Sequence, residues 1–436
     1  MPEKAPASPD EQLLEGLLEA FEVFSHRLRE IRRLGRYVRE RGEEIDDAKT
    51  RARELIQQQL SEVNDDALDE LMESWRQTVY AAAEAEGLSD DDRREVVQSA
   101  LEEASQGLPE GALSSYLRSI VRVTIAPPAA PMLLASLLIA LVGELETLFG
   151  SVTRALYIHD PTKLEQSGKQ YAWAEIKKFG TLDDFEAHVR DHTVDRMLHG
   201  SFGDWVSELK NRFHIPEPAR SGDFETLEII QRRHLMVHNR GFVSRQYLEK
   251  LDQFEHDTKL HDELEVDYDY LTRAADTLLV VSLSLISGAT FRVTSNEEVA
   301  QTMEGFLANT CFWLLQEKRY EAVVDITRRL PVGKVKTELY RHIIQVNGWI
   351  ALKQLGRFRE CADAVRRFDV SARSNDLRLA KLALLDDVER ADKLAQQMLA
   401  EGQLLHEHWL TWPLLADVRA YHDRQTLGEA EGASQA

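Results

Sequence analysis

The sequence contains very little cysteine and lacks several motifs that mark common catalytic chemistries. Its 436 residues include two cysteines, Cys311 and Cys361, which excludes a framework of several disulfide bonds and favours a reducing, cytoplasmic location. Neither cysteine has neighbours that suggest a nucleophile. No Gly-rich phosphate loop of the type G-x-x-x-x-G-K-[ST] and no G-x-S-x-G nucleophile elbow occur. Chemistry that depends on these two motifs is therefore not expected.

The sequence also lacks a basic-then-apolar leader and a long uninterrupted hydrophobic run. It begins MPEKAPASPDEQ, which gives no expectation of export. The most apolar stretches are 126–143, which contains three prolines, and 277–286, which is shorter than the ~20 residues that a spanning helix needs. We expect both to be buried helices, and we expect no membrane association.

Positive charge is scarce, because 53 Lys and Arg stand against 75 Asp and Glu, a net charge of -22. Such a chain is expected to avoid non-specific contact with nucleic acids and anionic membranes, so any nucleic-acid function must depend on a local basic site. One candidate recurs at helical spacing in the run RLREIRRLGRYVRER and comprises Arg29, Arg32, Arg33 and Arg36. This stripe is either a solvated face paired with nearby acids or a surface that contacts phosphates.

Helical periodicity along the chain predicts an all-α fold, and the length predicts two or three domains. Residues 1–125 form a helical region of unknown role, whose segments follow Ser, Asn or Asp residues suited to capping helices. The prolines of APPAAP, 126–131, predict a linker. Residues 132–290 predict a central up-and-down bundle with helices near 132–156, 182–198, 203–213, 223–239 and 266–287.

The region 296–425 contains an internal repeat. RYEAVVDITRRLP at 319–331 and RFRECADAVRRFD at 357–369 share Arg followed by an aromatic residue, Asp six residues after that Arg, and Arg-Arg before Leu or Phe. A repeated helix pair of this length resembles the tetratricopeptide class. Lys and Arg outnumber Asp and Glu by 17 to 12 between 317 and 393, so this region is a candidate surface for a partner protein or nucleic acid.

The segment QRRHLMVHNRGFVSRQYL, 231–248, places charged residues in an otherwise apolar helix. Arg233 and the histidines His234 and His238 precede Asn239-Arg240-Gly241, where Gly241 favours the end of the helix. Buried charge is costly unless it is paired or used. A guanidinium beside a histidine near a helix end suits reaction at a phosphodiester, because one group can stabilise developing charge while the other moves a proton.

This segment resembles the ribonuclease motif of HEPN domains (higher eukaryote and prokaryote nucleotide-binding), which is Arg, a polar residue, several variable positions and His. The matching positions are Arg233, His234 and His238, and the following VHNRG and YL strengthen the likeness. The apolar segment LLASLLIALVGELETLFG, which carries Glu146, resembles the first helix of such bundles. The resemblance covers the predicted bundle at 132–290.

The resemblance implies metal-independent RNA cleavage, in which a ribose 2′-OH attacks the adjacent phosphate and leaves a 2′,3′-cyclic phosphate. It implies His238 as general acid/base, Arg233 as the phosphate contact and His234 as an orienting or substrate-contacting group. Arg232 gives an alternative spacing, and Asn239 is placed to fix His238. It further implies an RNA substrate, a homodimer with a site shared by two protomers, and a setting in antiviral defence, abortive infection or a toxin-antitoxin pair. No cofactor is implied.

Three other interpretations remain open from the sequence. Arg233 can pair with a bundle carboxylate while His238 satisfies the helix end, which gives the motif a structural role. The pairs His234/His238 and His188/His192 have the i, i+4 spacing of metal ligands, but the first lacks the glutamate of an H-E-x-x-H site, and no metal site is expected. The chain can also be a non-catalytic scaffold, in which a HEPN-like dimerisation module and C-terminal repeats recruit a regulatory protein or bind a nucleotide.

Overall fold

The structure is a computed structural model that describes residues 7–47, 128–165, 170–330, 334–371 and 373–434, with isolated positions at 73, 77 and 99. Within these residues every regular element is a helix, and the β-type pairing is confined to one isolated bridge between Phe242 and Glu263. The predicted all-α class is therefore confirmed. Most of the predicted helical region 1–125, beyond residue 47, lies outside the described residues.

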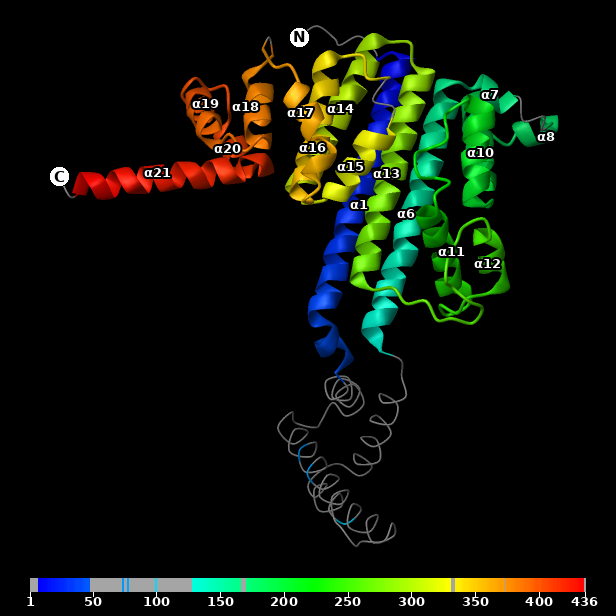
Figure 1. The fold of residues 1–436 in the computed structure, drawn as a ribbon. Coiled ribbons are helices and arrows are strands. Elements are labelled where there is room, and N and C mark those ends of the chain that lie inside the picture. Colours follow the sequence, from blue (N-terminus) through cyan, green and yellow to red (C-terminus); the bar gives the residue numbers. More distant parts are fainter. Residues whose placement is uncertain are drawn as a thin grey trace, which may run out of the picture. The chain divides into compact units, whose positions relative to one another are not determined.

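Helices fill the predicted bundle region (Figure 1). Two predictions match closely, since α9 spans Leu182–Leu198 and α10 spans Phe202–Phe213. Both begin at a capping box, in which the side chain of Thr181 or Ser201 accepts a hydrogen bond from the third residue of the helix. The others are α6 (Ala129–His159), α7 (Thr162–Glu165), α8 (Trp173–Ile176), α11 (Phe224–His238), α12 (Arg245–Leu251) and α13 (Tyr268–Val293). The specific HEPN arrangement of such helices stays a prediction.

The proline-rich segment differs from its prediction as a linker, because α6 begins at Ala129 and includes Pro131 in its first turn. Proline is tolerated there because the first NH groups of a helix have no partner within it. The carboxylate of Asp46, the last residue of helix α1 (Pro9–Asp46), accepts hydrogen bonds from the NH groups of Ala129 and Ala130. The start of α6 is thus fixed by a residue far away in the sequence.

The core is built around α13, whose residues from Thr277 to Thr290 are all buried. Its buried residues run almost without interruption from Leu271 to Thr290. Two helices, α6 and α13, are long and apolar enough to cross a membrane by length and composition, but the most apolar window of α13 is 89% buried inside the protein. A buried core helix passes the same test, and this agrees with the expected role of 277–286. The corresponding window of α6 is only 33% buried, and Met132 and Leu133 are exposed, so the expectation of a buried helix at 126–143 is wrong for much of that segment.

The C-terminal region is a succession of helices, and both segments of the sequence repeat are helical. RYEAVVDITRRLP contains α15 (Tyr320–Arg329), and RFRECADAVRRFD contains the short η2 (Phe358–Glu360) and α17 (Ala362–Arg367). The remaining elements are α14 (Glu297–Gln316), α16 (Glu338–Gln354), α18 (Asn375–Leu384), α19 (Val388–Ala400), α20 (His406–Thr411), η3 (Pro413–Leu415) and α21 (Ala416–Ser434). Helix α16 packs against α14, α15 and α18. A tetratricopeptide arrangement of these helices stays a prediction.

The chain divides into two compact units that do not follow the predicted domain boundaries. One unit contains residues 1–31, 139–264 and 269–436, and the other contains 32–138 and 265–268. The bundle and the C-terminal helices therefore share one unit, in which ion pairs join them: Arg220 to Asp325 at 3.0 Å, and Arg329 to Asp223 at 2.7 Å. The predicted division at 125 falls outside the described residues.

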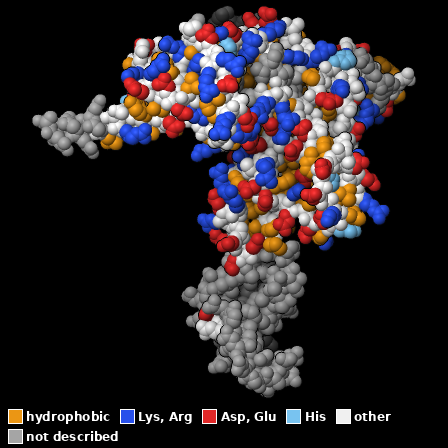
Figure 2. All heavy atoms as spheres, viewed as in Figure 1, with side chains coloured by type: hydrophobic (Ala, Val, Ile, Leu, Met, Phe, Trp, Pro, Cys, Tyr) orange, Lys and Arg blue, Asp and Glu red, His pale blue; other side chains and the backbone are white. Residues whose placement is uncertain are grey.

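The basic excess of the C-terminal region is largely paired. Figure 2 shows Lys and Arg side chains gathered where α15 and α16 lie, with acidic side chains between them. Arg328 pairs with Glu360 at 2.5 Å, and Arg357 pairs with Glu360 at 2.7 Å and with Glu321 at 3.1 Å. Much of the positive charge is thereby neutralised locally, and a role for this surface in binding a partner stays a prediction.

A close contact between α15 and α16 gives a test of this packing. A Cβ added to Gly348 would lie 2.7 Å from the Thr327 hydroxyl, whereas a Cβ at Gly143 of α6 would meet nothing within 4 Å. We expect Gly348→Ala to destabilise the protein by about 1–3 kcal/mol, because Thr327 is short and branched and cannot move aside. Gly143→Ala is the matched control and should stabilise by up to ~1 kcal/mol. Urea unfolding measures both, and equal effects would contradict the packing.

Near the start of α1, Asp10 joins three helices through polar contacts. Its carboxylate lies 2.8 Å from Nε2 of His159 at the end of α6, and it accepts a hydrogen bond from Thr294, just after α13. Burial alone would raise the pKa of Asp10, but the hydrogen bonds from Thr294 and His159 and the charge of His159 lower it below its ordinary value of 3.8.

The lowered pKa of Asp10 predicts a contribution to stability that depends on pH. A carboxylate whose pKa is lower in the folded state stabilises that state above its ordinary pKa, and the contribution is lost as pH falls through the folded-state pKa. We expect Asp10→Asn to lower the Tm at neutral pH, with the difference from wild type shrinking below pH 3.8. The control Asp257→Asn, at an exposed loop position, should show no such trend. A pH-independent difference would contradict this role.

Candidate functional site

The candidate site lies at the C-terminal end of α11, where the chain turns sharply. Asn239 caps the helix, and Arg240 and Gly241 follow with φ of 52° and 86°. The left-handed turn therefore begins one residue earlier than the predicted Gly241. Glycine is still required at 241, because a Cβ there would lie 3.0 Å from the Leu264 carbonyl oxygen. The helix end is thus set by close backbone packing as well as by its sequence.

The turn is fastened to the loop that precedes α13. The Val243 NH donates to the Asp262 carbonyl at 2.8 Å, and the Leu264 NH donates to the Gly241 carbonyl at 3.0 Å. Beneath the turn, a small apolar core holds α11 against α12 and consists of Leu235, Val243, Tyr247 and Leu251. Val237, on the same helix, is 44% exposed. The end of α11 is therefore anchored on one side and open to solvent on the other.

Arg233 lies beside a carboxylate of α6. Its guanidinium is 4.0 Å from Glu146, with side chains 32% and 37% exposed, so the contact is a loose and solvated ion pair. The buried Nε of Arg233 has no hydrogen-bond partner among the described residues. Arg233 thus has a nearby acid, as the structural interpretation requires, and also retains an unused donor.

The two histidines of the motif lie next to each other. The ring centroids of His234 and His238 are 4.6 Å apart, and His238 is exposed to solvent while His234 is half-buried. Burial lowers the pKa of His234, and the positive charges of His238 and Arg233 lower it further. Arg233 and His238 therefore both lie close enough to His234 to interact with it electrostatically.

The other two predicted residues are engaged elsewhere. Arg232 donates from Nε to Glu228 at 2.6 Å, and its guanidinium stacks over the Tyr270 ring at 4.1 Å. Asn239 donates through its side-chain amide to the Phe242 carbonyl, within the turn, so this amide stabilises the helix end. The structure brings together Arg233, His234, His238 and Glu146, and it places Arg232 on a separate buried network.

The remaining candidates from the sequence are the basic stripe of α1 and the pair His188/His192. In the basic stripe of α1, Arg29, Arg33 and Arg36 are exposed and Arg32 is half-buried. A hydrogen bond with Tyr268 raises the pKa of Arg36, so part of the stripe is paired within the protein. The rings of His188 and His192 are 6.4 Å apart. No group of three or more potential metal ligands occurs among the described residues.

Sequence reasoning missed a polar network beside the motif. Glu228 is 5% exposed and accepts hydrogen bonds from Arg232, from the Tyr247 hydroxyl at 3.1 Å and from the Tyr270 hydroxyl at 2.6 Å. Burial raises the pKa of both tyrosines, so both hydroxyls stay protonated and can donate. The sequence does show a glutamate within the apolar run LEII of α11, which could have indicated a buried carboxylate. Its tyrosine partners come from other helices, so the sequence does not identify them.

Comparison with family models, with curated proteins and with solved structures found no match for this chain.

The contact between the two histidines leads to a test in solution. We expect His234 to titrate below 6.5, and His238→Ala to raise the pKa of His234, because removal of a neighbouring cation favours its protonation. The rise should be partial, since burial and Arg233 still act on the ring. NMR titration of histidine-labelled protein measures this pKa. The control His192→Ala, on exposed α9, should leave it unchanged, and an unchanged value in His238→Ala would contradict the contact.

Proposed function

We propose that this protein is a metal-independent endoribonuclease of the HEPN type, with its active residues at the end of α11. The observation that carries the proposal is the gathering of Arg233, His234 and His238 around an anchored helix end that opens to solvent. Phosphodiester cleavage needs a cationic group for the phosphate and a group that exchanges protons near neutral pH. These side chains supply both.

In the proposed reaction, His238 accepts the proton of a ribose 2′-OH or delivers a proton to the leaving 5′-oxygen. The 2′-oxygen forms a bond to phosphorus, the bond to the 5′-oxygen breaks, and a 2′,3′-cyclic phosphate and a 5′-OH result. Arg233 binds the phosphate through the exposed part of its guanidinium, which its loose pair with Glu146 leaves available. His234, whose pKa is lowered, stays neutral at physiological pH and orients the substrate or His238.

A single copy of the site exposes its reactive group on one face, so we propose that two protomers combine their α11 ends into one composite site. The homodimer, a regulatory partner at the C-terminal helices and a cytoplasmic setting in antiviral defence, abortive infection or a toxin-antitoxin pair belong to this proposal. A compact site of few charges suits a chain of net charge -22, which disfavours extended RNA contacts.

The contact of Arg233 with Glu146 favours a second candidate function. If this pair is purely structural, the bundle serves as a non-catalytic dimerisation module and the C-terminal helices recruit a protein partner. The two functions differ in one property, because only the ribonuclease needs Arg233 and His238 to contact substrate.

The test is cleavage of labelled structured and unstructured RNA by the full-length protein in EDTA. We expect products that end in 2′,3′-cyclic phosphate, and a loss of about 10²–10⁴ in rate for Arg233→Ala and for His238→Ala. The matched controls are Arg245→Ala and His192→Ala, which alter exposed residues outside the site and should keep full activity.

Two results would count against the proposal. Cleavage that persists in both site variants would place the activity elsewhere, and cleavage abolished by EDTA would indicate a metal-dependent enzyme. Thermal unfolding of each variant separates chemistry from folding: an inactive variant with the wild-type Tm supports a role in catalysis, whereas an unfolded one supports the structural alternative. The mass of the wild type in solution tests the dimer.

A further inference from the structure

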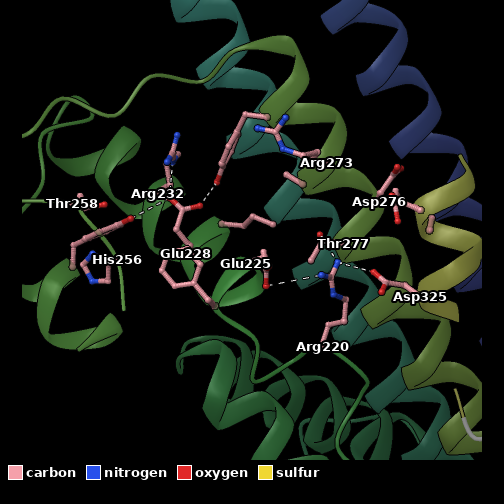
Figure 3. A pocket seen from close by; sticks show the side chains of 17 residues that line it. Arg220, Glu225, Glu228, Arg232, His256, Thr258, Arg273, Asp276, Thr277 and Asp325 are labelled. Carbon is pink, nitrogen blue, oxygen red and sulfur yellow. Dashed lines mark hydrogen bonds and ion pairs between the residues drawn. The ribbon is translucent and has the colours of Figure 1, made fainter. Parts of the chain in front are cut away.

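A cleft of about 640 Å³ lies on a different side of α11 from the histidine pair, among residues of α11, α12, α13 and α15 (Figure 3). Its volume is within the range of sites that hold small molecules. All of its lining residues belong to the compact unit that contains the bundle and the C-terminal helices. The chemistry of a suitable ligand follows from which polar groups of the cleft remain available.

Most charges of the cleft are already paired. Glu228 is bound by Arg232 and two tyrosine hydroxyls, and Arg220 pairs with Asp325 at 3.0 Å while donating to the Thr277 hydroxyl. The two other acids pair with arginines outside the lining, Asp276 with Arg319 at 2.5 Å and Glu321 with Arg357 at 3.1 Å. The charges of these four pairs cancel, so the pairs require neither an anion nor a cation as a ligand.

One group of each sign remains. Arg273 on α13 is exposed and makes no hydrogen bond or ion pair with any described residue. Glu225 on α11 is 57% exposed and lies 3.9 Å from Arg220, which has closer carboxylate partners. Figure 3 shows Arg273 and Glu225 apart from each other, on different helices. The cleft thus offers one guanidinium and one carboxylate at separate positions.

The surface that accompanies these two charges is largely apolar. Ile229 and Ala274 are buried residues of α11 and α13, Ala322 is a buried residue of α15, and Phe224 adds an aromatic ring at the start of α11. The ring of His256 stacks on Phe224, at 5.9 Å between centroids and 25° between planes, and its buried Nδ1 has no partner among the described residues. A ligand that fits must carry opposite charges and an apolar part.

We propose that this cleft binds a small zwitterion of the amino-acid class, as a free amino acid or a short peptide. The ligand's carboxylate pairs with Arg273, its ammonium group pairs with Glu225, and its side chain packs on the apolar surface. An anion could pair with Arg273 but would leave Glu225 without a cationic partner. A simple cation could pair with Glu225 but would leave Arg273 without an anionic partner. The proposal concerns binding alone, so it holds or fails independently of RNA cleavage.

The experiment is isothermal titration calorimetry of the full-length protein with the standard L-amino acids and with L-leucyl-L-leucine at millimolar concentration. We expect saturable binding of at least one of them. Arg273→Gln and Glu225→Gln should each weaken it about ten-fold or more, because each removes one charge-assisted contact. Arg359→Gln and Glu249→Gln, at exposed positions outside the cleft, should bind as the wild type does.

Ligands that carry one charge complete the test. Leucinamide presents the ammonium group alone and isocaproate the carboxylate alone, and both should bind much more weakly than leucine or its dipeptide. The proposal is overturned if no amino acid or dipeptide binds, if binding is the same in Arg273→Gln and Glu225→Gln, or if a singly charged analogue binds equally well. Tighter binding of the dipeptide than of leucine would identify peptides as the ligand, and the reverse would identify free amino acids.

Discussion

The burial of α13 is the constraint on which the rest of the unit depends. The part of this helix from Thr277 to Thr290 is buried throughout and must be surrounded, and each fully buried Leu, Ile or Val in it contributes roughly 1.5–3 kcal/mol relative to exposure. Its small polar residues do not disturb this burial, because Ser282 and Ser287 donate to backbone carbonyls one turn earlier. The neighbours are fixed in turn: the Ala219 NH donates to Ser284, and Pro216 packs on Gly288. The segment leading into α11 is therefore positioned by α13.

The same helix explains why the C-terminal helices share a unit with the bundle. Asp276, on the edge of α13, pairs with Arg319, whose side chain is 2% exposed, and Arg220 bridges from Thr277 to Asp325 of α15. Buried arginines need such partners, since an unpaired buried charge costs several kcal/mol. Burial raises the pKa of Asp325, while the charges of Arg220 and Arg329 oppose the rise. The carboxylate and the two arginines therefore stabilise each other in their charged forms. These ion pairs define the floor and side of the cleft.

Periodicity and capping residues predicted the five longer helices of the bundle region, α6, α9, α10, α11 and α13, in advance. The bounds of α9 and α10 follow from local chemistry, because Thr181 and Ser201 cap their own helices and the apolar spacing continues to the next break. Contacts between distant residues could not be foreseen. The sequence of APPAAP gives no sign that Asp46 will bind the NH groups of Ala129 and Ala130, and without that partner a linker was the reasonable expectation. Likewise, Glu228 is buried because tyrosines from α12 and α13 reach it.

The two adjacent arginines of α11 show how far a linear motif can be interpreted. Successive residues of a helix point about 100° apart, and here Arg232 and Arg233 lie in different surroundings. The cost of burying Arg232 is offset by its ion pair with Glu228 and by the Tyr270 ring, so Arg232 itself is committed to that network. Arg233 has one carboxylate at 4.0 Å and a side chain that is 32% exposed. Of the two, Arg233 therefore retains the capacity to bind a phosphate, and it is the one that shares its surroundings with His234 and His238.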